Sequence, residues 1–316
     1  MGKSIVQLAD EFVIYKHSLG YIYDTQEYYL RRYCKFEASY GCSSVLEKTA
    51  VIRYIDSLAG SPGTLYGTVS VLREFGRYLY RHGCKDVYII PDNTVFQQTP
   101  APPYFFTQSE IDEFFCAVDK VDPHPQFRGR EYIVPAFFRI LYCCGIRCKE
   151  ARMLRCENIS LREGWFDIVQ SKGPKTRRIY INDELGDFLK DYNKKIEQFY
   201  PEREFFFPGY DSHKHLSEGF VAENFRRFWN LAFPDFTGDI YPRAYDLRHH
   251  FAWANINRWA ADGMDVNVML PYLMRYMGHQ TIKQTLYYFH FVPDFYTTFQ
   301  FPSARFESTA FRRSSF

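Results

Sequence analysis

The sequence contains no run of about 18 or more apolar residues, the length that marks a membrane-spanning helix. Its first residues, MGKSIVQLADEF, are too acidic and too poor in apolar residues for a secretory signal peptide. The formal net charge is only +2, so overall charge does not by itself indicate a polyanionic partner. We therefore expect a cytoplasmic protein with no membrane partner, in which any contact with nucleic acid depends on local basic clusters.

The sequence also lacks a C-x-x-C pair, although it contains eight cysteines. Cys143, Cys144, Cys148 and Cys156 stand close together, but their spacing fits neither a zinc site nor a redox motif. We expect reduced and mostly buried thiols, and no metal site.

A chain of 316 residues with 46% hydrophobic content can bury two modest cores, and we expect two domains. Residues 1–89 show helical spacing of apolar residues, and the side chain of Asp24 is expected to cap the second helix while Glu27 reaches back to it. Residues 90–106 contain Pro91, Pro100, Pro102 and Pro103 and are expected to form an extended linker. The expected helices cover about residues 4–19, 24 onward, 47–58 and 64–82.

Residues 107–290 combine helices with a short pair of strands. Thr107 is expected to start a helix, because Glu110 follows at the spacing of a capping box. Residues 132–144 are almost wholly apolar and predict a buried helix. Apolar and polar residues alternate in 165–169 and 178–181, which predicts two strands joined by a basic turn. The predicted fold is mainly α with a small antiparallel β-sheet, as a helical N-terminal domain followed by an α+β domain.

Polar residues in several short boxes suit an attack on a phosphodiester. Arg147 follows the apolar helix in G-I-R-C-K-E, and Arg248 stands in Y-D-L-R-H. An arginine can direct two donors at one phosphate, which a lone ammonium cannot do with the same geometry. His279, in M-G-H, can donate to the same phosphate, and Tyr288, nine residues later, carries a phenol that can act as a covalent nucleophile.

These boxes, in this order, resemble the tyrosine recombinase family, also called the phage integrase family. The family patterns are G-x-R-x-x-E, K-G-x-K, D-L-R-H-x-F-A and G-H-x-x-x-x-x-T-x-x-Y-x-H, and the resemblance spans most of the chain. The matching residues are Gly145, Arg147, Glu150, Lys172, Lys175, Asp246, Leu247, Arg248, His249, Phe251, Ala252, Gly278, His279, Thr285, Tyr288 and His290.

The resemblance implies a role for each site residue. Arg147, Tyr245, Arg248 and His279 would bind the scissile phosphate, Tyr288 would form a 3′-phosphotyrosyl link, and Lys172 would protonate the departing 5′ oxygen. Glu150, Asp246 and His249 are expected to support them, while Lys175, Arg226 and Arg227 are expected to contact DNA. No metal or other cofactor is needed. Lys175 stays open as an alternative to Lys172, and Tyr287 as an alternative to Tyr288.

The sequence departs from the family at Tyr245, because the family has a histidine three residues before this arginine. A tyrosine hydroxyl can still donate a hydrogen bond to a phosphate oxygen. It is a poor base near neutral pH, since an unperturbed phenol has a pKa of about 10. We therefore expect Tyr245 to bind the phosphate and not to move protons.

The resemblance also implies partners. It implies a core-binding domain (residues 1–89) and a catalytic domain (107–290) that clamp double-stranded DNA with inverted-repeat core sites, in the bacterial cytoplasm at the nucleoid. The aromatic tail (291–316) would dock on a neighbouring protomer of a homotetramer in the synaptic complex, or fold back on its own domain. We expect an integrase or transposase of a mobile element. Alternatives are a chromosome-dimer resolvase, a type IB topoisomerase and an inactive DNA-binding accessory protein.

Overall fold

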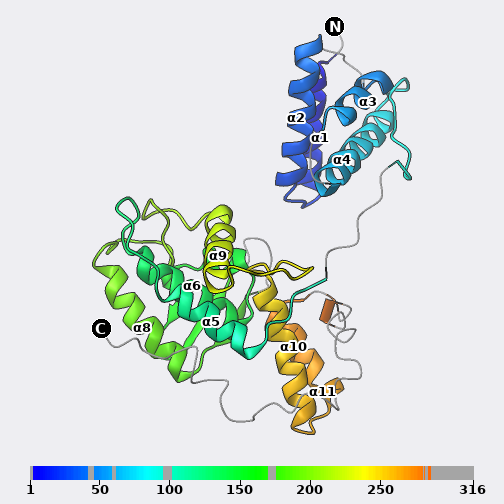
Figure 1. Cartoon of the computed structure of the whole chain (residues 1–316). Helices are drawn as coiled ribbons and strands as arrows, with labels where there is room; N and C mark the ends of the chain where they lie inside the picture. Colours follow the sequence, from blue (N-terminus) through cyan, green and yellow to red (C-terminus); the bar gives the residue numbers. More distant parts are fainter. Residues whose placement is uncertain are drawn as a thin grey trace. The chain divides into compact units, whose positions relative to one another are not determined.

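The computed structural model describes residues 3–41, 46–58, 62–94, 102–169, 176–279, 281 and 284–285. The chain divides into two compact units, Met1–Pro100 and Ala101–Phe316 (Figure 1). The fold is mostly helical with one three-stranded antiparallel sheet in the described residues, which confirms the predicted fold class. Ile90 belongs to the core of the first unit and Phe106 to that of the second, so the predicted linker (90–106) is packed at both ends.

The first unit contains the four helices that its apolar spacing predicts. Phe12, Leu72 and Phe75 are among the buried residues of its own core. Its helices are α1 (Ile5–Ser18), α2 (Asp24–Tyr40), α3 (Lys48–Asp56) and α4 (Pro62–Arg81).

The predicted cap of α2 is wrong, because the helix already begins at Asp24 and Tyr23 is its N-cap, without a capping side-chain hydrogen bond. Tyr23 has a left-handed backbone with φ 60°. Its ring packs edge-on against Phe12, and its hydroxyl donates a 2.9 Å hydrogen bond to Glu74. Tertiary packing of Tyr23 therefore determines where the helix begins, and this information is absent from the local pattern of Asp24 and Glu27.

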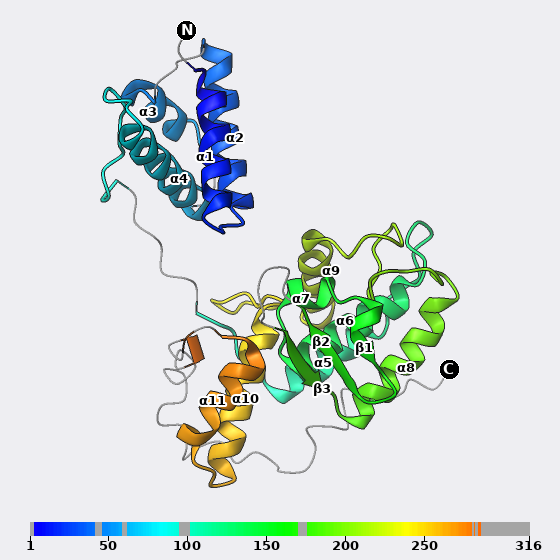
Figure 2. The ribbon, with the colours of Figure 1, turned by 180° about the vertical axis from the view of Figure 1, so that it is seen from behind.

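The second unit packs its helices around α6, with a small sheet beside them (Figure 2). The predicted capping box at the start of α5 is confirmed: the Thr107 hydroxyl accepts from the Glu110 amide, and the Glu110 carboxylate accepts from the Thr107 amide. The elements are α5 (Gln108–Val118), α6 (Arg130–Cys144), α7 (Cys148–Arg152), η1 (Cys156–Asn158), β1 (Ile159–Ser160), β2 (Trp165–Ile168), β3 (Arg177–Tyr180), α8 (Asp183–Glu197), α9 (Glu218–Ala232), α10 (Asp246–Ala261) and α11 (Val266–Met277).

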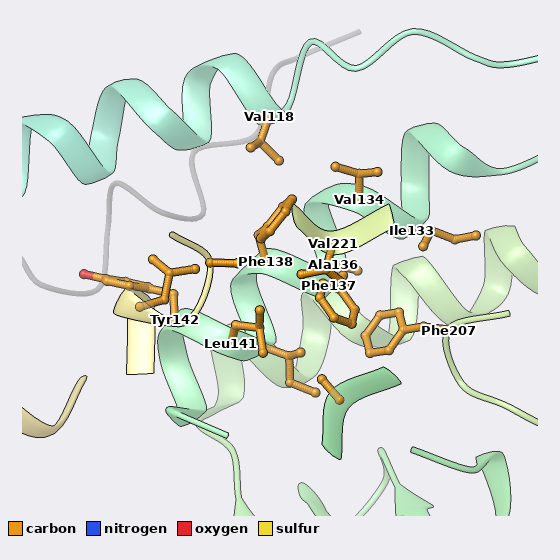
Figure 3. Close-up of a cluster of buried hydrophobic side chains, with 14 of the residues drawn as sticks. Val118, Ile133, Val134, Ala136, Phe137, Phe138, Leu141, Tyr142, Phe207 and Val221 are labelled. Atoms are coloured by element: carbon orange, nitrogen blue, oxygen red, sulfur yellow. The ribbon is translucent and has the colours of Figure 1, made fainter. Parts of the chain in front are cut away.

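Helix α6 is the centre of this unit, and it is buried on almost every side, as its apolar sequence predicts. Figure 3 shows its side chains in one cluster with Val118 of α5, with Val221 of α9 and with Phe207 of the segment between α8 and α9. The helix packs against α8 and α10, and it ends at Gly145, which has a left-handed backbone. The rigid helix therefore fixes the position of the chain two residues before Arg147.

The sheet has the order β1-β2-β3, with Phe166 opposite Ile179 on its buried face. The strand pair β2–β3 confirms the prediction, whereas β1, with only two residues, was not predicted because it is too short to show alternation. Helix α11 packs against β3, which places the first residues of β3 beside the end of α11. The predicted basic turn with Lys172 and Lys175 lies outside the described residues.

Candidate functional site

Arg147 lies at the start of α7, where its N-cap position points the side chain across the chain towards α11. Its Nη1 donates to Glu150 Oε1 (2.7 Å), and its backbone amide donates to Glu150 Oε2 (2.9 Å). Its Nη2 donates to the Gly278 carbonyl, 131 residues further along the chain (2.9 Å). Arg147 is thus held from two sides, by the carboxylate one helical turn away and by the residue directly before His279.

Arg248 lies in the first turn of α10, and 1% of its surface is exposed. Its Nη1 donates to the Gly145 carbonyl (2.8 Å), and its Nη2 donates to the Met277 carbonyl (2.7 Å). These carbonyls belong to the ends of α6 and α11, so they fix the guanidinium plane between three helices. A charge in such a dehydrated place interacts with a nearby anion more strongly than it would in water.

His279 follows Gly278, the C-cap of α11, and its Nδ1 shares a 2.8 Å hydrogen bond with the Thr285 hydroxyl. Thr285 is buried, and it holds the ring in one orientation. Arg147, Arg248 and His279 therefore meet where the end of α6, the start of α10 and the end of α11 come together.

The charges around His279 lower its pKa. Burial is the main cause, followed by the positive charges of Arg248, Arg147 and Arg177 and by His249, and together they bring the pKa to about 4. His279 is therefore neutral near neutral pH in the DNA-free protein. A bound phosphate would offset these positive charges and raise the pKa of the imidazole again.

Arg177 was not predicted as a site residue. Its Nη1 and Nη2 donate to the two oxygens of Glu150 (3.0 and 2.7 Å), and its Nε donates to the Tyr276 carbonyl (2.7 Å). Burial alone would raise the pKa of Glu150, but Arg177, with a smaller contribution from Arg147, holds it below its ordinary value. The only signal in the sequence was the position of Arg177 after the K-G-x-K box.

The residues that flank Arg248 occupy different environments. Asp246 is fully buried and accepts hydrogen bonds from the backbone amide, Nε and Nη2 of Arg243. Tyr245 is 41% exposed, and its ring packs edge-on against His249. Burial lowers the pKa of His249 to about 4. Tyr245 is thus partly accessible to solvent, whereas the buried Asp246 fixes the entry into α10.

Gly145 is a position where the site requires glycine. Its φ is +56°, and an added Cβ would collide with the Phe251 ring. We expect Gly145→Ala to lower the free energy of unfolding by about 2–4 kcal/mol, from the left-handed backbone and the collision together. Urea unfolding measures this. Gly186→Ala in α8 is the matched control, because its Cβ would meet nothing closer than 3.8 Å. An equal loss of stability in both variants would show that position 145 does not require glycine.

The buried His250 predicts acid sensitivity. Burial lowers its pKa from 6.5 to about 4, so between these pH values the unfolded chain binds a proton that the folded chain does not. The free energy of unfolding therefore decreases as the pH falls through this window, and His250 contributes about 2 kcal/mol of the decrease between about pH 7 and about pH 5.

Urea unfolding at both pH values tests this expectation. His250→Asn should reduce the pH dependence by that amount, while His213→Asn, on an exposed turn, should leave it unchanged. An unchanged slope in His250→Asn would show that the buried imidazole is not responsible.

The remaining predicted residues are less informative. Arg226 and Arg227 are exposed on α9, next to its buried face. Lys172, Lys175, Tyr287 and Tyr288 lie outside the described residues. The seven cysteines within the described ranges are free, but the expectation of mostly buried thiols is too strong, since only Cys34 and Cys144 of them are buried and Cys116 is exposed. The described residues contain neither a metal-binding group of three or more His, Cys, Asp or Glu nor a helix long and apolar enough to cross a membrane.

Comparison with known proteins assigns the chain to a family. The model of the phage integrase family matches residues 105–293. The putative integrase/recombinase y4rE of Sinorhizobium fredii is 22% identical over 284 residues, covering 88% of this chain and 89% of that protein. Transposase B from transposon PsiTn554 of Staphylococcus aureus is 24% identical over 255 residues, which are 78% of this chain and 37% of the transposase.

A solved structure has the same fold. The Tn1549 transposon integrase, in complex with a circular intermediate DNA, matches with a TM-score of 0.60 and 15% identity over 90% of this chain and 94% of that one. The family model covers the segments that hold Arg147, Arg248 and His279 together. The chain therefore belongs to the phage integrase family of tyrosine recombinases, a membership that implies DNA strand-transferase activity.

Proposed function

We propose that the protein is a site-specific recombinase that cuts and rejoins DNA through a 3′-phosphotyrosyl intermediate. The observation that carries this proposal is the convergence of Arg147, Arg248 and His279 at the junction of α6, α10 and α11. Two guanidinium groups and an imidazole at one place can donate hydrogen bonds to a phosphate and stabilise the negative charge that it gains during the reaction.

The proposed reaction is a transesterification of one phosphodiester at a time. The Tyr288 oxygen attacks the scissile phosphorus, the bond from phosphorus to the 5′ oxygen breaks, and Lys172 gives that oxygen a proton. The phenol proton leaves to another group or to water. Attack by a 5′ hydroxyl from a partner strand reverses these steps, because the phosphotyrosyl link preserves the phosphodiester energy. The roles of Tyr288 and Lys172 rest on the family resemblance.

The positive side chains act on the pentacoordinate phosphorus. Arg147 and Arg248 would neutralise its additional negative charge in a dehydrated site, where preorganised donors are most effective. Tyr245, at the exposed side, would donate its hydroxyl hydrogen to a phosphate oxygen. His279, neutral before DNA binds, would donate a further hydrogen bond or a proton as the phosphate raises its pKa.

The biological role that we propose is the integration or transposition of a mobile element. Two of the similar proteins support this role, since one is a transposase and the other a transposon integrase. The partner would be double-stranded DNA with inverted-repeat core sites, which both the domain of residues 1–89 and the catalytic domain of residues 107–290 would contact.

We further propose that the active form is a homotetramer on two duplexes. The catalytic unit has a cleft of about 740 Å³ among β3, α6, α10 and α11, whose lining includes Trp259, Tyr272 and Tyr276. Aromatic side chains of this kind suit the aromatic tail of a neighbouring protomer, residues 291–316, which lies outside the described residues.

A trapped covalent complex tests the proposed chemistry. DNA sites are selected from a random-sequence pool by repeated binding to the protein, and a nick is placed so that the cleaved fragment diffuses away. The wild-type protein should accumulate a complex that survives detergent and disappears with protease. A protein that binds these sites but yields no such complex would be a DNA-binding accessory protein. Efficient relaxation of plasmids without a selected site would instead indicate a topoisomerase.

A further inference from the structure

Arg177 is a largely buried cation that joins three elements of the second unit. It is the first residue of β3, and only 10% of its side chain is exposed. Its ion-pair partner is Glu150 of α7, whose side chain is 12% exposed, and its Nε bonds to the Tyr276 carbonyl near the end of α11. A long side chain that is immobilised in this way costs conformational entropy and desolvation, so its contacts need to be numerous and well formed.

Glu150 stands between two arginines. Each of its oxygens accepts one hydrogen bond from Arg177 and one from Arg147, with the donors on Arg147 being Nη1 and the backbone amide. The position of the carboxylate, and with it the position of the Arg147 guanidinium, therefore depends on Arg177. Only a planar fork can bond both oxygens of a carboxylate at once in this manner.

The Arg177 guanidinium also fills the space beside Gly278. A Cβ on Gly278 would lie 2.8 Å from Nη1 and 3.0 Å from Cζ of Arg177, and the φ of Gly278 is +66°. The carbonyl of Gly278 is in turn bonded by Arg147. The two arginines therefore enclose the single residue that connects α11 to His279, and glycine is the residue that leaves room for this arrangement.

We infer that Arg177 is a positioning residue for strand cleavage, which orients Arg147 through Glu150 and holds the Gly278 turn that presents His279. This inference rests on the proposed function. Arg177 also connects the catalytic groups to the strand pair β2–β3, because it is the first residue of β3 and pairs with Ile168 of β2.

Arg177→Met and Arg177→Lys test the inference, with Arg178→Met as the matched control. Arg178 is the next residue on β3, but it lies on the other face of the strand, where it pairs with Asp167 and stacks over Trp165. At saturating DNA, Arg177→Met should form the covalent complex about 100-fold more slowly, as expected when a catalytic group is displaced by about 1 Å. The DNA dissociation constant should stay within about threefold, because the interaction acts in the transition state. The cleavage rate of Arg177→Lys should lie between the rates of Arg177→Met and the wild type. Arg178→Met should cleave at the wild-type rate.

The titration of His279, followed by NMR of labelled histidine without DNA, gives a second measurement. Arg177 is one of the charges that lower the pKa of His279. The pKa of His279 should therefore increase in Arg177→Met, change less in Arg177→Lys, which keeps the charge, and stay the same in Arg178→Met. This titration reports that the Arg177 charge lies close to His279 in the folded protein, and the cleavage rates of Arg177→Met and Arg177→Lys report whether Arg177 positions the catalytic groups.

Each outcome decides the question. Wild-type cleavage rates in both Arg177 variants at saturating DNA, or a loss confined to DNA affinity, would overturn the inference. If Arg177→Met does not fold, the lysine variant decides, and failure of both to fold would make Arg177 a structural residue only. A wild-type protein that forms no covalent complex would refute the proposed function, yet the His279 titration would still report whether the Arg177 charge lies beside the histidine.

Discussion

Arg248→Lys should reduce the rate of covalent-complex formation at saturating DNA by about 100- to 1,000-fold, the usual effect of removing one preorganised donor from an oxyanion-type site. The lysine keeps the charge, but it cannot bridge the Gly145 and Met277 carbonyls that Arg248 bonds at 2.8 and 2.7 Å. Its ammonium would bond one carbonyl and leave the phosphate without a bidentate partner. Quenched-flow cleavage of a selected, nicked site measures the rate.

Arg162→Lys is the matched control for this prediction, since Arg162 is exposed on the turn between β1 and β2. It should cleave within about threefold of the wild type, as is usual for surface substitutions. Arg248→Lys should also lower the free energy of unfolding by about 1–3 kcal/mol, because a buried carbonyl loses its donor. The rate is therefore compared on protein that is shown to be folded. Equal rates in Arg248→Lys and the wild type would remove Arg248 from the site.

Tyr288→Phe should abolish the covalent complex to the limit of detection, because it removes the oxygen that we propose forms the phosphotyrosyl bond. DNA binding should be retained, since the ring is unchanged. The measurement is the fraction of a nicked, selected site that becomes detergent-resistant and protease-sensitive.

Tyr287→Phe is the natural comparison, because it removes the same atom from the adjacent residue. The spacing from His279 and the T-x-x-Y-x-H pattern select Tyr288, with Tyr287 as the alternative. The variant should form the complex at the wild-type level. The reverse pattern would assign the nucleophile to Tyr287, and a complex formed by both variants would mean that neither tyrosine acts alone.

Local signals in the sequence predicted local structure well. The Thr107–Glu110 capping box, the apolar helix α6 and the alternation in β2 and β3 each depend on residues a few positions apart, and the structure confirms them. The start of α2 was predicted wrongly because the position of Tyr23 depends on Phe12 and Glu74, which are distant in sequence.

The same distinction applies to the site. Arg147 and Arg248 could be recognised because each belongs to a short family pattern, G-x-R-x-x-E or D-L-R-H-x-F-A, and the patterns follow in the family's order. Arg177 could not, since its meaning comes from Glu150, 27 residues earlier, and from the Tyr276 carbonyl, 99 residues later. The left-handed Gly278 beside it is explained only when the guanidinium that fills its Cβ space is seen.

We propose that Arg147, Arg248 and His279 together stabilise the negative charge on one scissile phosphate. The most direct measurement compares cleavage of a site with an ordinary scissile phosphate and of the same site with an uncharged methylphosphonate there, using the wild type and Arg248→Ala. We expect the defect of Arg248→Ala to be large on the phosphate and much smaller on the methylphosphonate, because the charge that the arginine offsets is gone. An equal defect on both substrates would show that Arg248 does not act on the charge of the scissile phosphate.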